Sequence, residues 1–407
     1  MNSFALFLIK VRQLVFSSHT WILKDFLYSQ PVCTHFPHCS EYWKICFERY
    51  DFLPALKYTM ERIANCKPSE KIKYDPPFYK VVFFSSAPIG IPFLDKLLED
   101  KRFEVVWIVS GPDKPAWRGQ KLQENKVIEF LKKKLNHSVE DIDKELQVLH
   151  TDWKKIKVFK PEKIKQNQKF IQELKDLEAD FFVVISYGKI LPKEVLDIPK
   201  FWPINIHWSI LPKRRWASPI QSVFLNKEKE TGITLMYMNE KMDKWDIIKI
   251  LKFPLTKNDN AKTVIDKFSK YWPDFLVDTL WDFAKWKIKP IKQDDSKATY
   301  CWKFTKEDGL INFKKEKAED IYAKFQAFYL WPGIYTFWNW KILKFKDIDY
   351  DDENLEPAKV YWKDNKLKIW TPKWSIIVKK LQIEWKKVMD AKEFVNWYKD
   401  FVWTVLD

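Results

Sequence analysis

The sequence predicts an α/β domain with a mainly parallel sheet, followed by a small antiparallel β domain and preceded by a short helical, cysteine-rich segment. Between residues 81 and 284, short β-branched and aromatic runs alternate with polar helical stretches, which is typical of a parallel sheet with crossover helices. After residue 304 the pattern changes to alternating strands separated by turn-forming residues, which is typical of an antiparallel module. Cysteine is concentrated at the start, where residues 1–77 hold Cys33, Cys39, Cys46 and Cys66.

The alternation also fixes the expected elements and boundaries. We expect strands over Val81–Phe84, Val105–Val109, Ile156–Phe159, Phe181–Ile185, Ile204–His207 and Thr231–Met238. A helix is expected over Ala318–Phe328, and turns at Asp364-Asn365 and Thr371-Pro372 separate the strands that follow. The lysine-rich stretch 285–303 is expected to be a linker, which gives a division into 1–77, 78–284, 285–303 and 304–407, the last being a small OB-like barrel.

Composition and charge restrict the class of protein. With 46% apolar and 31% charged residues, the chain is neither disordered, nor collagen-like, nor a multispan membrane protein. The net charge of +16 is spread along the chain. A diffuse basic surface favours a polyanionic partner, because each neutralised phosphate releases counterions, although a lysine-rich solvated surface would have the same composition.

Glycine is rare and tryptophan is common in this chain. Ordinary usage would give about 7% glycine, on the order of 28 residues here. The chain has 7 glycines and 22 tryptophans. The two counts together approach the glycine content that an ordinary chain of this length would have.

One group of residues carries chemistry. Asn205 and His207 are two apart on an expected strand, so their side chains project from the same face at its carboxyl end, where open α/β sheets bind ligands. With Asp243, they would supply an amide donor for an oxyanion, an imidazole that moves a proton and a carboxylate that orients it. These are the groups that acyl transfer to an amine requires. Taken alone this set is a weak signal, because a single histidine in a core is more often structural.

Ordered motifs along residues 79–407 resemble the folate-dependent formyltransferases, and most closely the bacterial methionyl-tRNA formyltransferases. The run Asn205-Ile-His207-Trp-Ser209-Ile210-Leu211-Pro212 is similar to the family signature Asn-x-His-x-Ser-Leu-Leu-Pro. The other matching blocks are Val81–Phe84, Pro112–Gly119, Tyr187–Pro192, Glu230–Thr234, the motif around Asp243, Ala298–Tyr300 and Leu381–Lys387.

The resemblance implies a Rossmann-like fold and transfer of formyl from 10-formyltetrahydrofolate to initiator methionyl-tRNA, with no metal. It implies His207 as general acid/base, Asn205 as oxyanion donor and Asp243 as the group that holds His207 and helps to position a relay water. It further implies a tRNA-binding basic loop with Lys114, Arg118 and Lys121, and folate contacts from Ser209, Ile210, Leu211, Pro212, Tyr187, Gly188, Ile190 and Leu191. The first strand ends in Ser85-Ser86-Ala87-Pro88, which lacks the glycine fingerprint of a dinucleotide site. The protein is expected to be a monomer.

Many tryptophans stand where the family has glycine. They include Trp117, Trp216, Trp245 and Trp385, and Trp107, Trp340, Trp374 and Trp397 look alike. Tryptophan adds a large side chain and gives up the positive φ that glycine adopts freely. We hypothesise that the gene comes from an organism that reads UGA as glycine, and that UGA was translated here as tryptophan.

Residues 1–77 lie outside the formyltransferase pattern. The run from Cys33 to Tyr42, followed by Cys66-Lys67-Pro68, resembles the membrane protein insertion efficiency factor family, which implies an inner-membrane surface as a partner. The opening residues 4–15 form an amphipathic pattern that can lie on a membrane or pack on its own domain. A zinc site at Cys33, His35, His38, Cys39 and Cys66 is a lesser alternative, because no Cys-x-x-Cys pair is present. A start at Met60 would remove most of this segment.

Two alternatives to the tRNA enzyme stay open. One is a formyltransferase acting on a sugar nucleotide or another amine. The other is a membrane insertion factor with a non-catalytic appendage. We expect a cytoplasmic protein that can be peripheral at the inner membrane, since no run reaches the roughly 18 apolar residues of a spanning helix.

Overall fold

The computed structural model describes residues 35–64, 73–115, 122–135, 139–141, 146–150, 155–353 and 356–406. Two compact units are present. The first contains the described residues up to Asn205 together with 273–289, and the second contains 206–272 and 290 onward. The expected amphipathic start, Cys33 and Cys66 lie outside the described residues.

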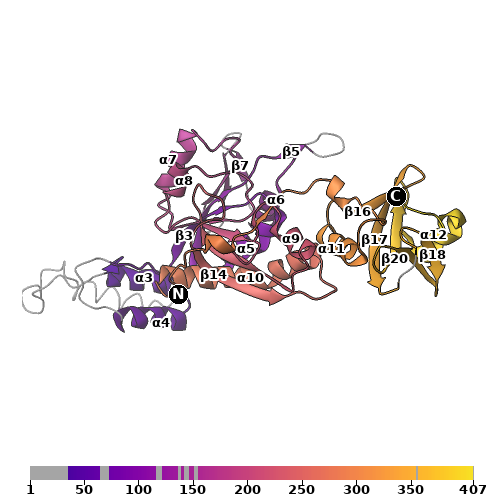
Figure 1. Ribbon diagram of the computed structural model, residues 1–407. Helices are drawn as coiled ribbons and strands as arrows, with labels where there is room; N and C mark the ends of the chain where they lie inside the picture. Colours follow the sequence, from indigo (N-terminus) through magenta and orange to yellow (C-terminus); the bar gives the residue numbers. More distant parts are fainter. Residues whose placement is uncertain are drawn as a thin grey trace, which may run out of the picture. The chain divides into compact units, whose positions relative to one another are not determined.

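A nine-stranded sheet in the order β14-β13-β11-β10-β3-β4-β9-β8-β7 forms the centre of the α/β part (Figure 1). The pairs β10/β11, β10/β3, β3/β4 and β4/β9 are parallel, and the pairs at both edges are antiparallel. The mainly parallel sheet predicted from the sequence is therefore confirmed. The bounds are β3 Tyr79–Phe84, β4 Phe103–Val109, β7 Val139–Asp141, β8 Leu146–His150, β9 Lys155–Phe159, β10 Phe181–Val184, β11 Ile204–His207, β13 Glu230–Tyr237 and β14 Ile247–Pro254.

Central strands are apolar along their whole length because both faces are covered. All four residues of β10 are buried, and so are the last four residues of β3. Continuous apolar runs of this kind are expected for parallel strands beneath helices on both sides. The helices are α5 Ile91–Glu99, α6 Lys126–Leu135, α7 Gln168–Asp176, α8 Lys193–Leu196, α9 Pro219–Leu225 and α10 Ala261–Ala284.

The N-terminal module consists of α3 (Cys39–Arg49), α4 (Phe52–Ala64) and the short parallel pair β1 (His35–Phe36) and β2 (Lys73–Tyr74). It packs on the rest of the first unit by direct side-chain contacts. The Arg49 guanidinium donates to the carbonyls of Lys101 and Phe103, at 2.5 and 2.6 Å, and the Tyr50 hydroxyl donates to the Pro77 carbonyl at 2.6 Å. These contacts tie the module to the start of β4.

The C-terminal part is an antiparallel sheet in the order β16-β17-β20-β19-β18, with β21 paired to β20. Its elements are α11 Ala318–Ala327, β16 Ile334–Trp338, β17 Lys341–Asp351, β18 Val360–Lys363, β19 Lys366–Trp370, β20 Ser375–Ile383, β21 Met389–Asp390 and α12 Ala391–Trp397. Asp364 and Asn365 both adopt positive φ, 51° and 58°, as a two-residue type I′ hairpin requires. The antiparallel module is confirmed, whereas its closure into a barrel and the four domain boundaries stay predictions.

Tryptophan occupies left-handed backbone positions repeatedly. Positive φ is found at Trp216, Trp286, Trp340, Trp374, Trp385 and Trp403. Left-handed backbone costs a residue with a Cβ roughly 1–2 kcal/mol, and glycine avoids that cost. Trp340 is fully exposed and Trp385 is 92% exposed, so these two rings gain little from burial. Trp107, a buried residue of β4, does not have a positive φ, and neither do Trp245 and Trp397. Trp117 lies outside the described residues.

Candidate active site at the end of strand β11

Strand β11 brings Asn205 and His207 to one face of the sheet. Asn205 pairs in register with Val184 of β10 and is partly buried. His207 ends the strand and is only 5% exposed. Because residues two apart on a strand point the same way, the amide and the imidazole project together, as the sequence predicted.

The hydrogen bonds of His207 fix which ring nitrogen is basic. Its Nε2 lies 2.8 Å from the carbonyl oxygen of Arg214. Since a carbonyl oxygen only accepts, Nε2 must carry the proton, and in the neutral ring the lone pair is on Nδ1. Nδ1 lies 3.5 Å from Oδ1 of Asp243. The geometry therefore leaves Nδ1 as the proton acceptor, facing a carboxylate.

The backbone holds the Asp243 carboxylate in position. Its Oδ2 accepts a hydrogen bond from the backbone N–H of Trp216 at 2.9 Å. Its own φ is 57°, in the left-handed region that Asp tolerates better than most residues. The carboxylate thus has one oxygen fixed by the backbone and the other turned toward His207.

A buried amide, which sequence reasoning missed, fixes the Asp243 loop. Gln293 is 7% exposed, and its Nε2 donates to the carbonyls of Asp243 and Trp245, at 3.0 and 2.6 Å. Its Oε1 accepts from Arg215 Nη2 at 2.8 Å. Gln293 falls in the stretch expected to be a linker, and nothing in the sequence around it signals contact with a loop 50 residues earlier.

Ser209 and Leu211, predicted folate contacts, have structural partners in this loop. The buried Ser209 hydroxyl donates to the Lys213 carbonyl at 2.7 Å, and the Ser209 carbonyl accepts from Thr234 Oγ1 at 2.7 Å. Thr234 Oγ1 in turn accepts from Leu211 N at 3.1 Å. Leu211 packs with Met236 and Ile247. The loop that contains the predicted folate contacts is therefore rigidly supported from β13.

Ile210 and Pro212 complete that loop and are partly exposed. A Cβ at Gly232 of β13 would meet Ile210 Cγ1 at 3.0 Å and collide with the Leu251 carbonyl. Glycine is required there, because both a side chain and a backbone group approach it closely. Gly232 is thus one position where the chain keeps a glycine for a packing reason.

The other predicted folate segment follows β10 in the first unit. Tyr187 and Leu191 are buried, and the Tyr187 ring lies against Phe84 at 5.6 Å. Gly188 has a φ of 78°, and Ile190 is 73% exposed. Tyr187 and Leu191 anchor the segment, while Gly188 and Ile190 present its surface. The assignment of these residues to a folate site stays a prediction.

The basic loop has a described stem. Strands β5 (Lys114–Pro115) and β6 (Leu122–Gln123) pair antiparallel, with Lys114 opposite Gln123. Arg118 and Lys121 lie outside the described residues. Before the stem, Asp113 pairs with the buried Lys160 at 3.0 Å. The stem therefore starts from a fixed point in the first unit.

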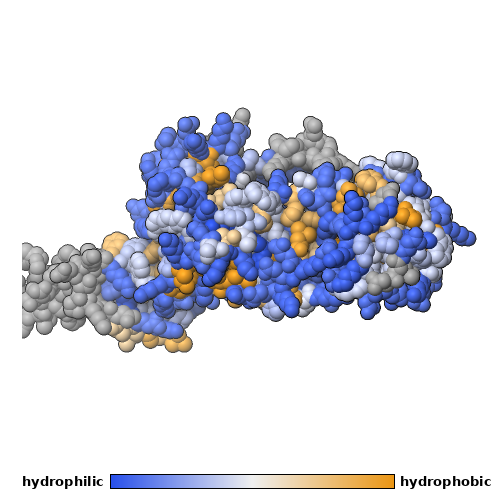
Figure 2. All heavy atoms as spheres, viewed as in Figure 1, coloured by the Kyte–Doolittle hydropathy of each residue, from blue (hydrophilic) through white to orange (hydrophobic). Residues whose placement is uncertain are grey.

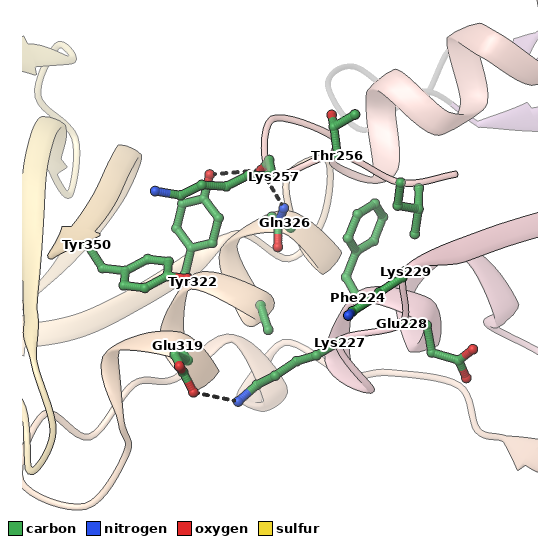
Figure 3. A pocket seen from close by; sticks show the side chains of 12 residues that line it. Phe224, Lys227, Glu228, Lys229, Thr256, Lys257, Glu319, Tyr322, Gln326 and Tyr350 are labelled. Carbon is green, nitrogen blue, oxygen red and sulfur yellow. Dashed lines mark hydrogen bonds and ion pairs between the residues drawn. The ribbon is translucent and has the colours of Figure 1, made fainter. Parts of the chain in front are cut away.

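A cavity of about 420 Å³ lies within the second unit between α11 and the turns after α9 and β14 (Figure 3). Figure 3 shows Tyr322 and Gln326 directed toward the Lys257 carbonyl, to which they donate at 3.1 and 2.8 Å. Lys227 pairs with Asp320 at 2.6 Å, and Lys257 lies 4.7 Å from the Tyr350 ring. Lys227 and Lys257 thus connect the turns after α9 and β14 to α11 and β17, respectively.

The residues that the structure describes contain no group of three or more His, Cys, Asp or Glu side chains that could hold a metal ion. Nor is any helix among the described segments long and apolar enough to cross a membrane.

Comparisons with known proteins match three parts of the chain. Residues 79–280 match the model described as formyl transferase, 303–399 the formyl transferase C-terminal domain, and 1–77 the putative membrane protein insertion efficiency factor. A methionyl-tRNA formyltransferase of Caldicellulosiruptor saccharolyticus is 35% identical over 334 residues, which cover 78% of this chain and 97% of that protein.

Two solved structures share the fold. One is an N-formyltransferase from Helicobacter canadensis in complex with folinic acid and dTDP-3-aminofucose, with a TM-score of 0.51 and 17% identity over 74% of this chain and 98% of that one. The other is HypX from Aquifex aeolicus in complex with tetrahydrofolic acid, with a TM-score of 0.50 and 13% identity over 80% of this chain and 48% of that one. The chain thus spans about half the length of HypX.

Proposed function

The chain belongs to the formyl transferase family, and from that membership we propose that it transfers the formyl group of 10-formyltetrahydrofolate to the α-amine of methionyl-tRNA. The observation that supports this most directly is the pairing of His207 Nδ1 with Asp243 at 3.5 Å, beside Asn205. The matched relatives are named methionyl-tRNA formyltransferases, and the C-terminal family match covers most of the antiparallel module.

The proposed reaction uses each group once. The amine nitrogen attacks the formyl carbon, and the Asn205 amide donates to the oxyanion that forms. His207 takes the amine proton on Nδ1, because Nε2 is already protonated against the Arg214 carbonyl. Asp243 stabilises the resulting imidazolium. The bond from the formyl carbon to N10 then breaks, and the proton passes to N10 of the departing tetrahydrofolate.

The acceptor is proposed to be initiator methionyl-tRNA, bound in part by the basic loop. Lys114 begins the β5–β6 stem, and Arg118 and Lys121 belong to the stretch that the stem joins. A loop rooted in this way can carry cations to an acceptor stem, where they would contact phosphates. The folate contacts are proposed for the loops 187–191 and 209–212.

The test compares acceptors and variants in one assay. The protein and 10-formyltetrahydrofolate are incubated with methionyl-tRNA or with a dTDP-amino sugar, and formylated product is measured. We expect product with methionyl-tRNA, and a loss of about 10²–10³ in turnover for Asn205→Ala, since one oxyanion donor is removed. Formylation of the sugar alone, or near-parental turnover of Asn205→Ala, would refute the proposal.

Membrane-surface association of the N-terminal module is a second candidate function. Helix α4 exposes one apolar face, which Figure 2 shows along the lower edge of the module. The side chains of this face are 40–74% exposed, and at 100° per residue they lie within an arc of about 100° around the helix axis. They are Phe52, Leu53, Leu56, Met60 and Ile63. An exposed apolar face of this kind suits a lipid surface, in accord with the family match of residues 1–77.

Vesicle flotation tests this second function. The full chain should float with vesicles, and Leu53→Asp, which places a charge on the most exposed of these positions, should abolish flotation without affecting formyl transfer. Lys44→Asp on α3 is the control, because it also places a carboxylate at an exposed position and lowers the net charge by two, which is more than Leu53→Asp does. Equal flotation of all three proteins would exclude this role for α4.

A further inference from the structure

A small cavity lies where the N-terminal module meets the end of α10, and its lining carries more positive than negative charge. Its volume is about 140 Å³, and it is lined by Arg62, Lys73, Lys285 and Lys287, together with Glu61 and Asp75. All of these residues belong to the first unit. Four cations and two carboxylates leave a net of two positive charges.

The charge imbalance is greatest in the buried part of the cavity. Arg62 is 3% exposed and Asp75 is 9% exposed. Asp75 accepts from Lys285 Nζ, and its Oδ2 lies 3.4 Å from Arg62 Nη1. One carboxylate therefore serves one buried cation, Arg62, and one partly buried cation, Lys285. Removing charges from water is costly unless they are paired, so this core has one positive charge too many.

Arg62 also has an unused donor. Its Nη1 and Nη2 donate to the carbonyls of Asp75 and Pro37. Its Nε is buried and has no hydrogen-bond partner among the described residues. A buried donor without a partner costs about 1–3 kcal/mol, which makes it a marker for a ligand that the chain itself does not provide.

Neighbouring cations act on the titratable groups at the cavity. Burial lowers the pKa of Lys285, and Arg62 and Lys73 lower it further, while Asp75 raises it. Burial likewise lowers the pKa of His35, with a contribution from Arg62. At the mouth, Glu61 lies 4.0 Å from the exposed Lys57, and Lys287 lies 3.3 Å from Asp282. Lys73 at the entrance is exposed.

We propose that this cavity binds one phosphate-class oxyanion through Arg62 and Lys285, with Lys73 at its entrance. A phosphate monoester carries about −1.5 to −2 charges at pH 7, which matches the two positive charges of the lining; a carboxylate would neutralise only one. The volume corresponds to roughly four or five water molecules at about 30 Å³ each, enough for one tetrahedral group. An arginine and lysines in one site are the side chains that recognise phosphate in proteins.

The test measures binding of inorganic phosphate to the full chain by calorimetry, with chloride at the same ionic strength as the reference. We expect saturable binding of one phosphate. Lys285→Gln should weaken it at least about tenfold and Lys73→Gln about threefold, whereas Lys44→Gln on the outer side of α3 should bind like the parent. Because Lys73 is exposed, its variant should fold even if Lys285→Gln does not.

Two further arms separate a free anion from a lipid headgroup. Flotation with vesicles of phosphatidylglycerol is compared with flotation with vesicles of phosphatidylcholine, for the parent and for Lys73→Gln, so that the apolar contribution of α4 is the same in both proteins. If the natural source is a headgroup, Lys73→Gln reduces binding to phosphatidylglycerol and inorganic phosphate competes with it. If the source is a free phosphate, Lys73→Gln weakens phosphate binding and leaves flotation unchanged. No saturable phosphate binding, or parental affinity in both Lys73→Gln and Lys285→Gln, overturns the proposal.

Discussion

The backbone carbonyl of Arg214 faces Nε2 of His207 at 2.8 Å, and Arg214 itself has a φ of 59°. The turn after β11 thus directs a carbonyl at the ring, and the backbone selects which neutral tautomer of the imidazole is present, the one with the proton on Nε2. Because no side chain makes this contact, it survives substitution of Arg214 as long as the turn does.

His207→Ala should lower the turnover of formyl transfer by about 10²–10⁴, the usual contribution of a positioned general base. The loss should appear in kcat more than in the KM for methionyl-tRNA, because the ring is buried rather than displayed to the RNA. His38→Ala, at an exposed histidine of the N-terminal module, is the control and should behave like the parent in the same steady-state assay. Equal rates for the two variants would contradict the assignment.

Asp243→Asn should keep the loop and lose the charge. Its side-chain oxygen can still accept from Trp216 N, which now lies 2.9 Å from Asp243 Oδ2, but the imidazolium on His207 is no longer stabilised. We expect kcat to fall by about 10²-fold or more with little change in melting temperature. Asp246→Asn is the matched control, since Asp246 contacts Tyr237 through its backbone carbonyl; a similar loss in both would point to loop damage.

Gln293→Ala should lower activity only by changing the position of the Asp243 loop. The variant removes both hydrogen bonds to the carbonyls of Asp243 and Trp245 and the acceptor of Arg215 Nη2, while the side chains of the three catalytic residues stay unchanged in the sequence. We expect roughly a tenfold lower kcat, with Gln293→Asn, whose amide is too short to reach both carbonyls, in between. Steady-state kinetics across pH measures kcat, and thermal unfolding measures the midpoint. If Asp243 is displaced, kcat falls while the unfolding midpoint stays near that of the parent; if folding is lost, both fall.

Asp259 should stabilise the start of α10 in a pH-dependent way. Burial raises its pKa, but hydrogen bonds from Lys267, Thr256 and Thr263 lower it more, and the net shift is downward. A lowered folded-state pKa gives stability that is present above the unfolded value of about 3.9 and is lost as the pH falls through the folded value.

Asp259→Asn should therefore destabilise the chain by about 1.5–3 kcal/mol at pH 7 and by much less near pH 3. Urea unfolding at both pH values measures this. Asp266→Asn, an exposed pair with Lys262 on the same helix, should cost little at either pH. A destabilisation of Asp259→Asn that is independent of pH would show that its charge is not what matters.

Glycine at the left-handed tryptophans should stabilise the protein. Each replacement at Trp216, Trp286, Trp340, Trp374, Trp385 and Trp403 should relieve about 1–2 kcal/mol of backbone strain. Trp397→Gly, in the right-handed backbone of α12, should instead cost roughly 0.5–1 kcal/mol. Thermal unfolding of the single variants decides between these signs.

The same positions test the hypothesis that UGA encodes glycine in the source organism. Its codons at Trp216, Trp340, Trp374 and Trp385 should be TGA, and the native protein should be lighter by the difference between a tryptophan and a glycine at each site. TGG codons at these positions would end the hypothesis. The comparison with the family pattern had identified four of the six left-handed tryptophans, Trp216, Trp340, Trp374 and Trp385. Trp286 and Trp403 are identified only by their backbone angles.

The expected strands agree closely with the structure, because apolar runs bounded by turns identify buried strands well. Ile204–His207 agrees residue for residue, and Thr231–Met238 differs from β13 by one residue at each end. The pairing of His207 with Asp243 followed from the family pattern. Gln293 and the Arg214 carbonyl could not be predicted, because one lies far away in sequence and the other is a backbone group whose direction depends on a single φ.

Arg49 and Tyr50 bind backbone carbonyls at Lys101, Phe103 and Pro77. A polypeptide initiated at Met60 would lack both side chains and the whole of α3. The rest of the first unit would then have three carbonyls without these donors, and the Trp281 ring would lose Tyr58, whose ring lies 5.7 Å from it. The choice of start codon would thus affect the stability of the first unit, as well as decide whether the N-terminal module is complete.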